Sequence, residues 1–178
     1  MMKLPKDPTK RTKRLELRTF RVSDYGVWKE YKLRTQRAKN RWDRIIKKPS
    51  DASLSAFRKF FKKLRSDERR DFTYTFGVFL RDSGELIGFI AIMEVYRSLS
   101  HSAYLGYRID SAFWGNGYGK EAVKAALKLG FCDLKLHRLE AGIEPQNERS
   151  IALAKSLGMR FEGRKKRAVF FAENGATF

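Results

Sequence analysis

Apolar residues recur along the chain with two periods, which predict where strands and helices lie. Alternation with a period of two predicts a strand at residues 15–20 and another at 103–109. Two further runs, at 74–80 and 86–96, flank the turn-forming segment 82–85, and this is the pattern of a β-hairpin. The middle of the chain is therefore expected to form consecutive antiparallel strands.

Two helices are predicted in the first half from apolar positions spaced three and four residues apart. Ser23 is the expected cap of the first helix, whose apolar positions are Tyr25, Val27, Trp28 and Tyr31. Asp51 is the expected cap of the second, at residues 51–70, whose apolar stripe is Leu54, Phe57, Phe60, Phe61 and Leu64. A shorter apolar stripe between the two helices consists of Trp42, Ile45 and Ile46.

The second half alternates helices with strands. A third helix follows a glycine-rich loop with Ala122, Val123, Ala126 and Leu127 on one stripe, and Gly119 is expected to let it pack closely on the sheet. Asn147 is the expected cap of a fourth helix that ends at Gly158, between strands expected at 138–143 and 159–171. The order predicts an α/β fold with a mixed, mostly antiparallel sheet flanked by helices.

Charge is distributed unevenly along the 178 residues. The chain has 39 Lys and Arg against 20 Asp and Glu, and residues 1–70 alone hold 24 basic and 8 acidic side chains. Residues 1–14 are polar and basic and are expected to form a flexible arm, with a single domain at 15–178. The basic face of the second helix, with Arg58, Lys59, Lys62, Lys63 and Arg65, suits either a solvated surface or contact with an acidic protein or RNA.

The remaining composition favours a cytoplasmic protein that does not enter a membrane. No apolar run approaches the roughly 20 residues that a membrane span needs. Cys132 is the only cysteine, which excludes an intramolecular disulfide, and it is expected to be a buried small apolar residue. His101 and His137 stand at strand entries and are expected to be structural, and no metal-ligand spacing is present.

The segment Trp-Gly-Asn-Gly-Tyr-Gly-Lys at 114–120 has the plan of a phosphate-binding loop. Glycines at 115, 117 and 119 let main-chain amides approach an anion, and the helix that follows adds the positive end of its dipole. It is not a Walker loop, because no Gly-Lys-Ser/Thr ends it, and no acidic residue completes a dinucleotide-binding motif. The sequence therefore predicts a phosphate ligand of another kind.

Three motifs occur in one order: the loop extended to Ala122, His-Arg-Leu-Glu-Ala at 137–141, and Asn-x-x-Ser at 147–150 followed by Leu-Gly-Met. Together they resemble the GNAT superfamily of acetyltransferases. The preceding Tyr-Leu-Gly-Tyr-Arg-Ile and the opening Thr-Lys-Arg-Leu-Glu-Leu-Arg bring the resemblance closer to the ribosomal-protein-alanine N-acetyltransferase branch. The resemblance implies that acetyl-CoA is the cosubstrate. It implies that the cosubstrate is bound by Tyr107, Arg108, Ile109, Trp114, Gly115, Asn116, Gly117, Tyr118, Gly119, Lys120, Asn147 and Ser150. Trp114 stands where the family has Arg or Gln.

The implied reaction is direct attack of an amine on the thioester in a ternary complex, which needs a neutral amine and a leaving thiolate that is protonated. Many relatives have a tyrosine as proton donor seven residues after the Asn, but this chain has Ala154, which leaves Ser150 or a water. Glu140 and Glu94 are the candidate bases. Glu140 and Glu144 are expected to share a strand face if that strand extends so far.

The resemblance implies a protein N-terminus as the acceptor, such as that of a ribosomal protein. An α-amine, with a pKa of about 8, is partly neutral at pH 7 even without a strong base. The alternative is a ribosome- or RNA-binding protein that keeps the fold with weak or lost catalysis. The resemblance implies a turn at Asn174-Gly175 into a final strand, which is expected to be missing, so a dimer partner is expected to be able to complete the sheet.

Overall fold

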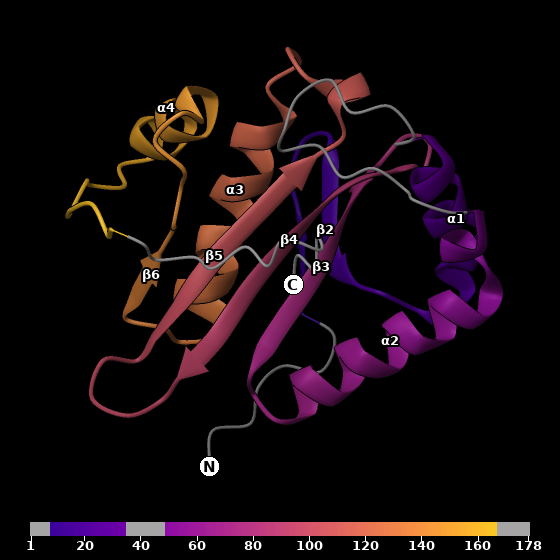
Figure 1. The fold of residues 1–178 in the computed structure, drawn as a ribbon, viewed down its shortest axis with the longest axis horizontal. Coiled ribbons are helices and arrows are strands. Elements are labelled where there is room, and N and C mark those ends of the chain that lie inside the picture. Colours follow the sequence, from indigo (N-terminus) through magenta and orange to yellow (C-terminus); the bar gives the residue numbers. More distant parts are fainter. Residues whose placement is uncertain (1–7, 35–48, 167–178) are drawn as a thin grey trace.

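The computed structural model describes residues 8–34 and 49–166 (Figure 1). Its strands are β1 (Thr9–Arg11), β2 (Leu15–Thr19), β3 (Thr73–Leu80), β4 (Leu86–Tyr96), β5 (Ser102–Ile109) and β6 (Arg138–Glu140). Its α-helices are α1 (Tyr25–Arg34), α2 (Leu54–Arg69), α3 (Tyr118–Lys128) and α4 (Glu148–Ser156). The strands form one sheet in sequential order, and every neighbouring pair is antiparallel except β5 and β6, which are parallel. The predicted mixed, mostly antiparallel sheet flanked by helices is confirmed.

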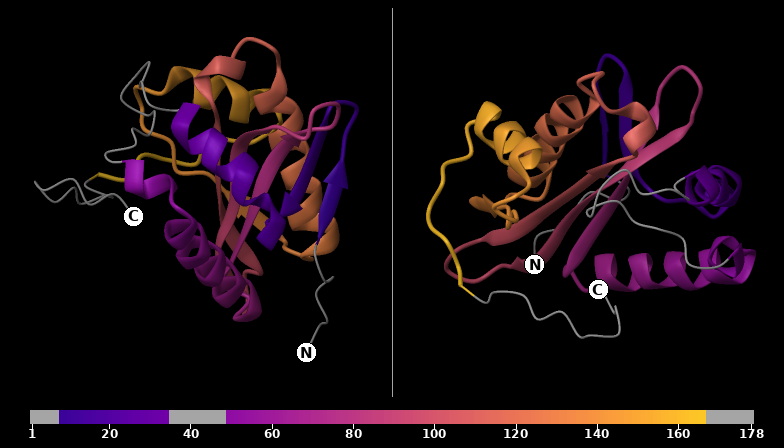
Figure 2. Two further views of the ribbon diagram at one scale, coloured as in Figure 1. Left: turned by 90° about the vertical axis from the view of Figure 1, so that its right-hand side faces the viewer. Right: turned by 45° about the horizontal axis from the view of Figure 1, so that its top comes forward.

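The sheet lies between two layers of helices. Figures 1 and 2 show α1 and α2 on one face, with α3 and its neighbour α4 on the other. The core beneath α3 is mostly aliphatic and contains small residues of that helix, including Ala122, Val123 and Ala126. The core beneath α1 and α2 is mostly aromatic, with Phe20, Trp28, Tyr31, Phe57 and Phe79. The same sheet therefore supports two helix layers that pack with side chains of different size.

Strand β5 shows how the sheet divides its side chains between these layers. Ala103, Leu105, Tyr107 and Ile109 belong to or pack against the aliphatic core. Because side chains alternate along a strand, Tyr104, Gly106 and Arg108 face the opposite side. Pairing with β6 ends at Tyr104 opposite Glu140, whereas β5 continues to Ile109. The two parallel strands are therefore paired only at the beginning of β5.

Several boundaries differ from the sequence-based expectations. Thr9–Arg11 pair with β2 as strand β1, so these residues are not part of a flexible arm.

The caps of the first two helices also differ from the expectation. Ser23 lies in a 3-10 turn, Val22–Asp24, and Asp24 instead accepts the Arg21 amide at 2.7 Å. Ser53 replaces Asp51 as the cap of α2, because its side chain accepts the Ala56 amide. Neighbouring polar residues compete for a cap, and sequence alone does not decide between them.

The end of the described chain is less regular than expected. Residues 159–166 form no strand, so the prediction of a strand over 159–171 is wrong for that part. Strand β6 ends at Glu140 and does not reach residue 143. The expected stripe of Trp42, Ile45 and Ile46 and the segment that follows residue 166 lie outside the described residues.

Candidate active site

The glycine-rich loop joins β5 to α3, as the sequence predicted. Gly115 and Gly117 have φ angles of 85° and 75°, a backbone conformation that residues with a Cβ rarely adopt. Gly117 stands at the cap position of α3 and has no side chain to bond the first amides of the helix. No atom lies within 4 Å of a Cβ built at Gly115. The loop thus offers space and the start of an 11-residue helix to an anionic group.

A carboxylate that sequence reasoning missed fixes this loop to the start of the sheet. Glu121, in the first turn of α3, accepts hydrogen bonds from Thr12 Oγ1 at 2.5 Å and Arg14 Nε at 2.7 Å. Arg14 also donates to the Asn116 carbonyl and stacks on the Tyr118 ring. Burial would raise the pKa of Glu121, but its bonds from Thr12 and Arg14 outweigh this and lower it. The position of the loop therefore depends on an ionised Glu121.

Trp114 packs against the protein within the same loop. Its Nε1 donates to the Ile109 carbonyl at 2.8 Å, and the Arg149 guanidinium lies 4.8 Å from the centre of its ring. The indole thus connects the end of β5 to α4 at the position where the family has Arg or Gln. This geometry favours a structural role for the side chain.

Gly119 allows two helices to approach one another. A Cβ at this position would lie 3.0 Å from Leu153 Cδ1 of α4 and 3.9 Å from Ile109 Cγ1 of β5. Close packing was expected against the sheet, but the nearer neighbour is α4. The missing side chain therefore brings α4 beside the loop.

The side chain of Tyr107 connects β5 to α4. Its hydroxyl lies 2.8 Å from Ser150 Oγ and donates to the Ser150 carbonyl at 3.1 Å. Asn147 caps α4 by accepting the Ser150 amide at 3.2 Å, as predicted. Burial raises the pKa of Tyr107, although its bond to Ser150 lowers it in part. Tyr107, Asn147 and Ser150 are thus brought together next to the glycine-rich loop, while Arg108 points to the other face of the sheet.

Both candidate bases line one hollow beside the paired segments of β5 and β6. The hollow has a volume of about 520 Å³, and its lining includes Glu94, Glu140, Tyr104, Tyr96 and Phe72. Glu94 is exposed and has a φ of 52°, a strained value for a residue with a side chain. Glu140 instead forms an ion pair with Arg138 at 3.0 Å. The hollow therefore combines two carboxylates with three aromatic rings.

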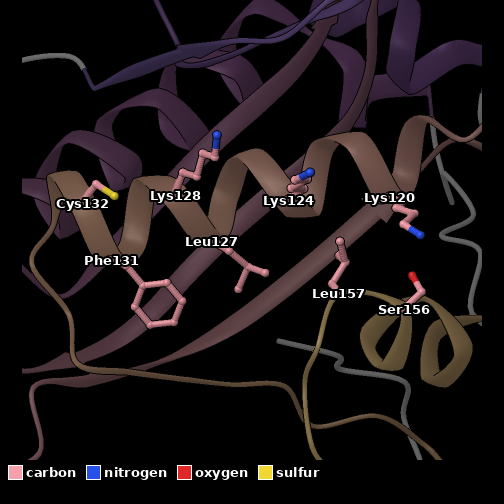
Figure 3. Close-up of a pocket in the computed structure, with 8 residues that line it drawn as sticks. All are labelled: Lys120, Lys124, Leu127, Lys128, Phe131, Cys132, Ser156 and Leu157. Atoms are coloured by element: carbon pink, nitrogen blue, oxygen red, sulfur yellow. The ribbon is translucent and has the colours of Figure 1, made fainter.

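Two other expectations about the site region are corrected. Glu144 lies beyond the end of β6, so it does not share a strand face with Glu140. Cys132 is exposed instead of buried. It lies at one end of a groove between α3 and α4, of about 510 Å³, in which Leu127, Phe131 and Leu157 point toward the space between the helices (Figure 3). The groove begins at Lys120, next to the glycine-rich loop.

His101 and His137 stand immediately before β5 and β6, as expected, and the His137 amide donates to the His101 carbonyl at 2.7 Å. Within residues 8–34 and 49–166, no group of three or more His, Cys, Asp or Glu side chains is arranged to hold a metal ion. None of the helices described there is long and apolar enough to cross a membrane.

Comparison with known proteins agrees with this geometry. A family model described as an acetyltransferase (GNAT) domain matches residues 14–160. The chain belongs to the GNAT family. The matched range contains the glycine-rich loop, the Tyr107 and Ser150 pair and the hollow at Glu94, so every part of the candidate site lies within it.

Individual GNAT relatives match parts of the chain. The uncharacterized N-acetyltransferase YnaD of Bacillus subtilis is 30% identical over 158 residues, which cover 89% of this chain and 86% of that protein. The [ribosomal protein uS5]-alanine N-acetyltransferase of Escherichia coli is 37% identical over 93 residues, 52% of this chain and 48% of that one. The chain spans about half the length of several curated relatives that it matches. Mycobacterium smegmatis RimJ, solved in complex with CoA-disulfide, is 27% identical with a TM-score of 0.74, covering 84% of this chain and 71% of that one.

Proposed function

We propose that this protein transfers the acetyl group of acetyl-CoA to the α-amino group of a protein N-terminus, such as that of a ribosomal protein. The observation that carries the proposal is the glycine-rich loop placed beside the Tyr107 and Ser150 pair, because it joins a phosphate site to a hydroxyl group at the start of α4. Relatives named as ribosomal-protein acetyltransferases support the acceptor class. The family match favours an enzyme over a protein that only binds RNA.

The loop suits the pyrophosphate of acetyl-CoA. Gly115, Asn116 and Gly117 form the turn, and Tyr118, Gly119 and Lys120 begin α3, whose first amides lack a capping side chain. Beyond Tyr104 the edge of β5 has no pairing with β6, so its last residues, Tyr107 to Ile109, can pair with an amide-containing arm. In this proposal the Trp114 side chain packs within the protein. The Asn147 side chain forms a hydrogen bond to acetyl-CoA near its thioester.

Ser150 would stabilise the leaving sulfur by donating a hydrogen bond. Tyr107 has one proton, and when it is donated to Ser150 Oγ instead of to the Ser150 carbonyl, the serine proton is left for the sulfur. Complete transfer from Tyr107 is unfavourable, because its pKa is raised above the usual value of about 10 while a thiol has about 8.5. We infer that the pair stabilises the developing thiolate, which then takes its proton from water. Ala154, only 7% exposed, supplies no hydroxyl.

The acceptor amine would enter through the hollow beside the paired segments of β5 and β6. There its nitrogen would form the bond to the acetyl carbon as the carbon–sulfur bond breaks, and the amine proton would leave through water. Glu94 is the better placed base, because it is exposed and makes no ion pair with a described residue, whereas Glu140 is held by Arg138. The carboxylates also attract an N-terminal ammonium group before it loses its proton.

Two measurements test this proposal. Acetyl-CoA far above its dissociation constant should raise the melting temperature, because it binds only the folded protein. Release of thiol from acetyl-CoA is then followed with peptides that begin with Ala or Ser, and with an Nα-acetylated peptide carrying an internal lysine as the matched control. Turnover of the free N-termini alone supports the proposal. Absence of thermal stabilisation, or turnover of the lysine peptide alone, contradicts it.

A further inference from the structure

The structure separates the basic residues that fix the fold from those left to solvent. In the described part of the N-terminal half, many cations form ion pairs, such as Lys10 with Asp133, Arg14 with Glu121, Arg18 with Asp24, Arg34 with Asp110 and Arg65 with Glu68. These positive charges are paired with carboxylates of the same chain. Others on α2 are exposed and have no carboxylate within 4.0 Å among the described residues: Arg58, Lys59, Lys62 and Arg69.

Three of these four cations form a stripe on one side of α2. At 3.6 residues per turn, Arg58, Lys62 and Arg69 fall within about 40° of arc, and Lys59 flanks them. Their eleven-residue span corresponds to roughly 16 Å along the helix axis. Ser55 and Ser66 fall close to the same sector and are small enough to leave the cations unobstructed. The nearest helix carboxylate on the Lys59 side, Asp67, is buried and bonded to Lys63 and Arg70.

The orientation of this stripe is fixed by packing on the opposite side of the helix. Phe57 is 1% exposed and its ring contacts those of Trp28, Tyr25, Phe60 and Phe61. Figure 1 shows α2 beside α1, on the face of the sheet opposite α3 and α4. The stripe therefore forms a rigid, outward-facing basic surface.

We propose that this stripe, Arg58, Lys62 and Arg69 with Lys59, binds the phosphate backbone of a nucleic acid. The regular charge of the backbone, one phosphate per 3.4 Å of each DNA strand, presents several phosphates to a stripe of this length. The site is separate from the acetyl-transfer site and does not depend on it.

Two other partners fit this surface less well. A stable protein interface has apolar anchors at its centre, whereas the centre of this stripe is charged and its exposed apolar neighbour, Leu54, lies at the edge. An interfacial membrane helix inserts its apolar face, but the apolar face of α2 is packed against α1 and the sheet. Binding to phosphates needs only the cations that the stripe presents.

The test measures the salt dependence of binding by fluorescence anisotropy with the full chain. The probes are a labelled 16-base-pair RNA duplex, the DNA duplex of the same sequence, and a labelled poly-glutamate peptide. Four phosphate contacts predict a slope of log K against log [KCl] of about −3.6 on a duplex, or about 150-fold weaker binding at 200 mM than at 50 mM. The triple variant Arg58→Gln, Lys62→Gln, Arg69→Gln should retain only about a fourfold salt effect.

The matched control removes the same charge from exposed lysines of α3 and α4, as Lys124→Gln, Lys128→Gln, Lys155→Gln. It should keep the salt slope of the wild type. The triple variant should still melt as the wild type does and still be stabilised by acetyl-CoA, which separates this proposal from the proposed function. Equal weakening by both triple variants, or poly-glutamate binding with the same affinity and slope as the duplexes, would overturn the proposal. Preference between the RNA and DNA duplexes identifies which nucleic acid the stripe binds.

Discussion

The two faces of the sheet are packed with different side chains and differ in the groups that they bring together. On the side of α3 and α4, alanines and Gly119 let helices approach closely, and the glycine-rich loop, Tyr107 and Ser150 meet there. On the side of α1 and α2, a cluster of aromatic rings fills the space beneath the helices, and the exposed surface of α2 carries cations that form no ion pair with a described residue. In the proposed function, small residues position the acetyl-CoA site on one face, while large rings hold a charged surface on the other.

Removing a ring from the aromatic layer should give the largest effect. Phe57→Ala deletes a buried phenyl group and should lower the free energy of unfolding by about 3–5 kcal/mol. Because the ring lies on the face opposite the loop, the folded variant should bind acetyl-CoA with unchanged affinity. Urea unfolding and calorimetric titration at low temperature measure the two quantities. Loss of affinity in the folded variant would show that the two faces are coupled.

A substitution in the glycine-rich loop should have the reverse pattern. Gly117→Val forces a β-branched residue to a φ of 75° and should cost about 1–3 kcal/mol of stability. It also crowds the start of α3, so the dissociation constant of acetyl-CoA should rise at least tenfold. Gly84→Val is the matched control, since Gly84 has a φ of 71° in the hairpin turn between β3 and β4. It should lose similar stability and keep its affinity for acetyl-CoA.

These contrasts show what the sequence could and could not reveal. The hairpin, the loop with its helix and the Asn147 cap produce local patterns, and each was predicted. The hydrogen bonds of Thr12 and Arg14 to Glu121, which anchor the loop, produce no local sequence pattern. Thr12 and Arg14 lie more than 100 residues from Glu121, and Thr9–Arg11 have no apolar alternation. The general form of the site is thus encoded locally, whereas the contacts that fix it are not.

Side-chain roles were harder to predict than positions. Tyr107 was expected only as a residue that binds the cosubstrate, and the fold alone brings its hydroxyl to Ser150. Glu94 and Glu140 were competing candidates, and the structure places both in one hollow because β4 and β6 flank β5. Cys132 looked like a core residue by type, but it falls beyond the end of α3, in a π-helical turn at Leu129–Asp133, where it is exposed.

Removing a single hydroxyl group of the site should have a smaller effect, which is measured on kcat. Tyr107→Phe removes the bond that orients Ser150, and kcat should fall about tenfold, the equivalent of one lost hydrogen bond of about 1.4 kcal/mol, with KM for acetyl-CoA unchanged. Ser150→Ala should lower kcat to a similar degree, and the double variant should be no worse than either single one. Tyr25→Phe, on the other face, is the control and should keep full activity. Additive losses in the double variant would contradict the positioning role.

The smallest effect is expected for the pH dependence of the stability that Glu121 contributes by fixing the glycine-rich loop. The pKa of Glu121 is lowered in the folded protein, so its contribution to stability is present above its unfolded pKa of about 4.5 and is lost as the pH falls through the folded value. Glu121→Gln should therefore melt below the wild type by a few degrees at pH 7, and the difference should shrink below about pH 4.5. Glu68→Gln, which disrupts an ion pair on α2, serves as a control that leaves acetyl-CoA affinity unchanged. A difference between wild type and Glu121→Gln that is constant from pH 7 to pH 3 would exclude the ionised anchor.

The comparison of the two faces is tested most directly by hydrogen exchange with and without saturating acetyl-CoA. The account predicts that the ligand slows exchange of amides at residues 115–120 and 147–150 and along the end of β5, and that α2 is unaffected. Slower exchange confined to α2, or no change in the loop under saturation, would contradict the assignment of the acetyl-CoA site to the face of α3 and α4.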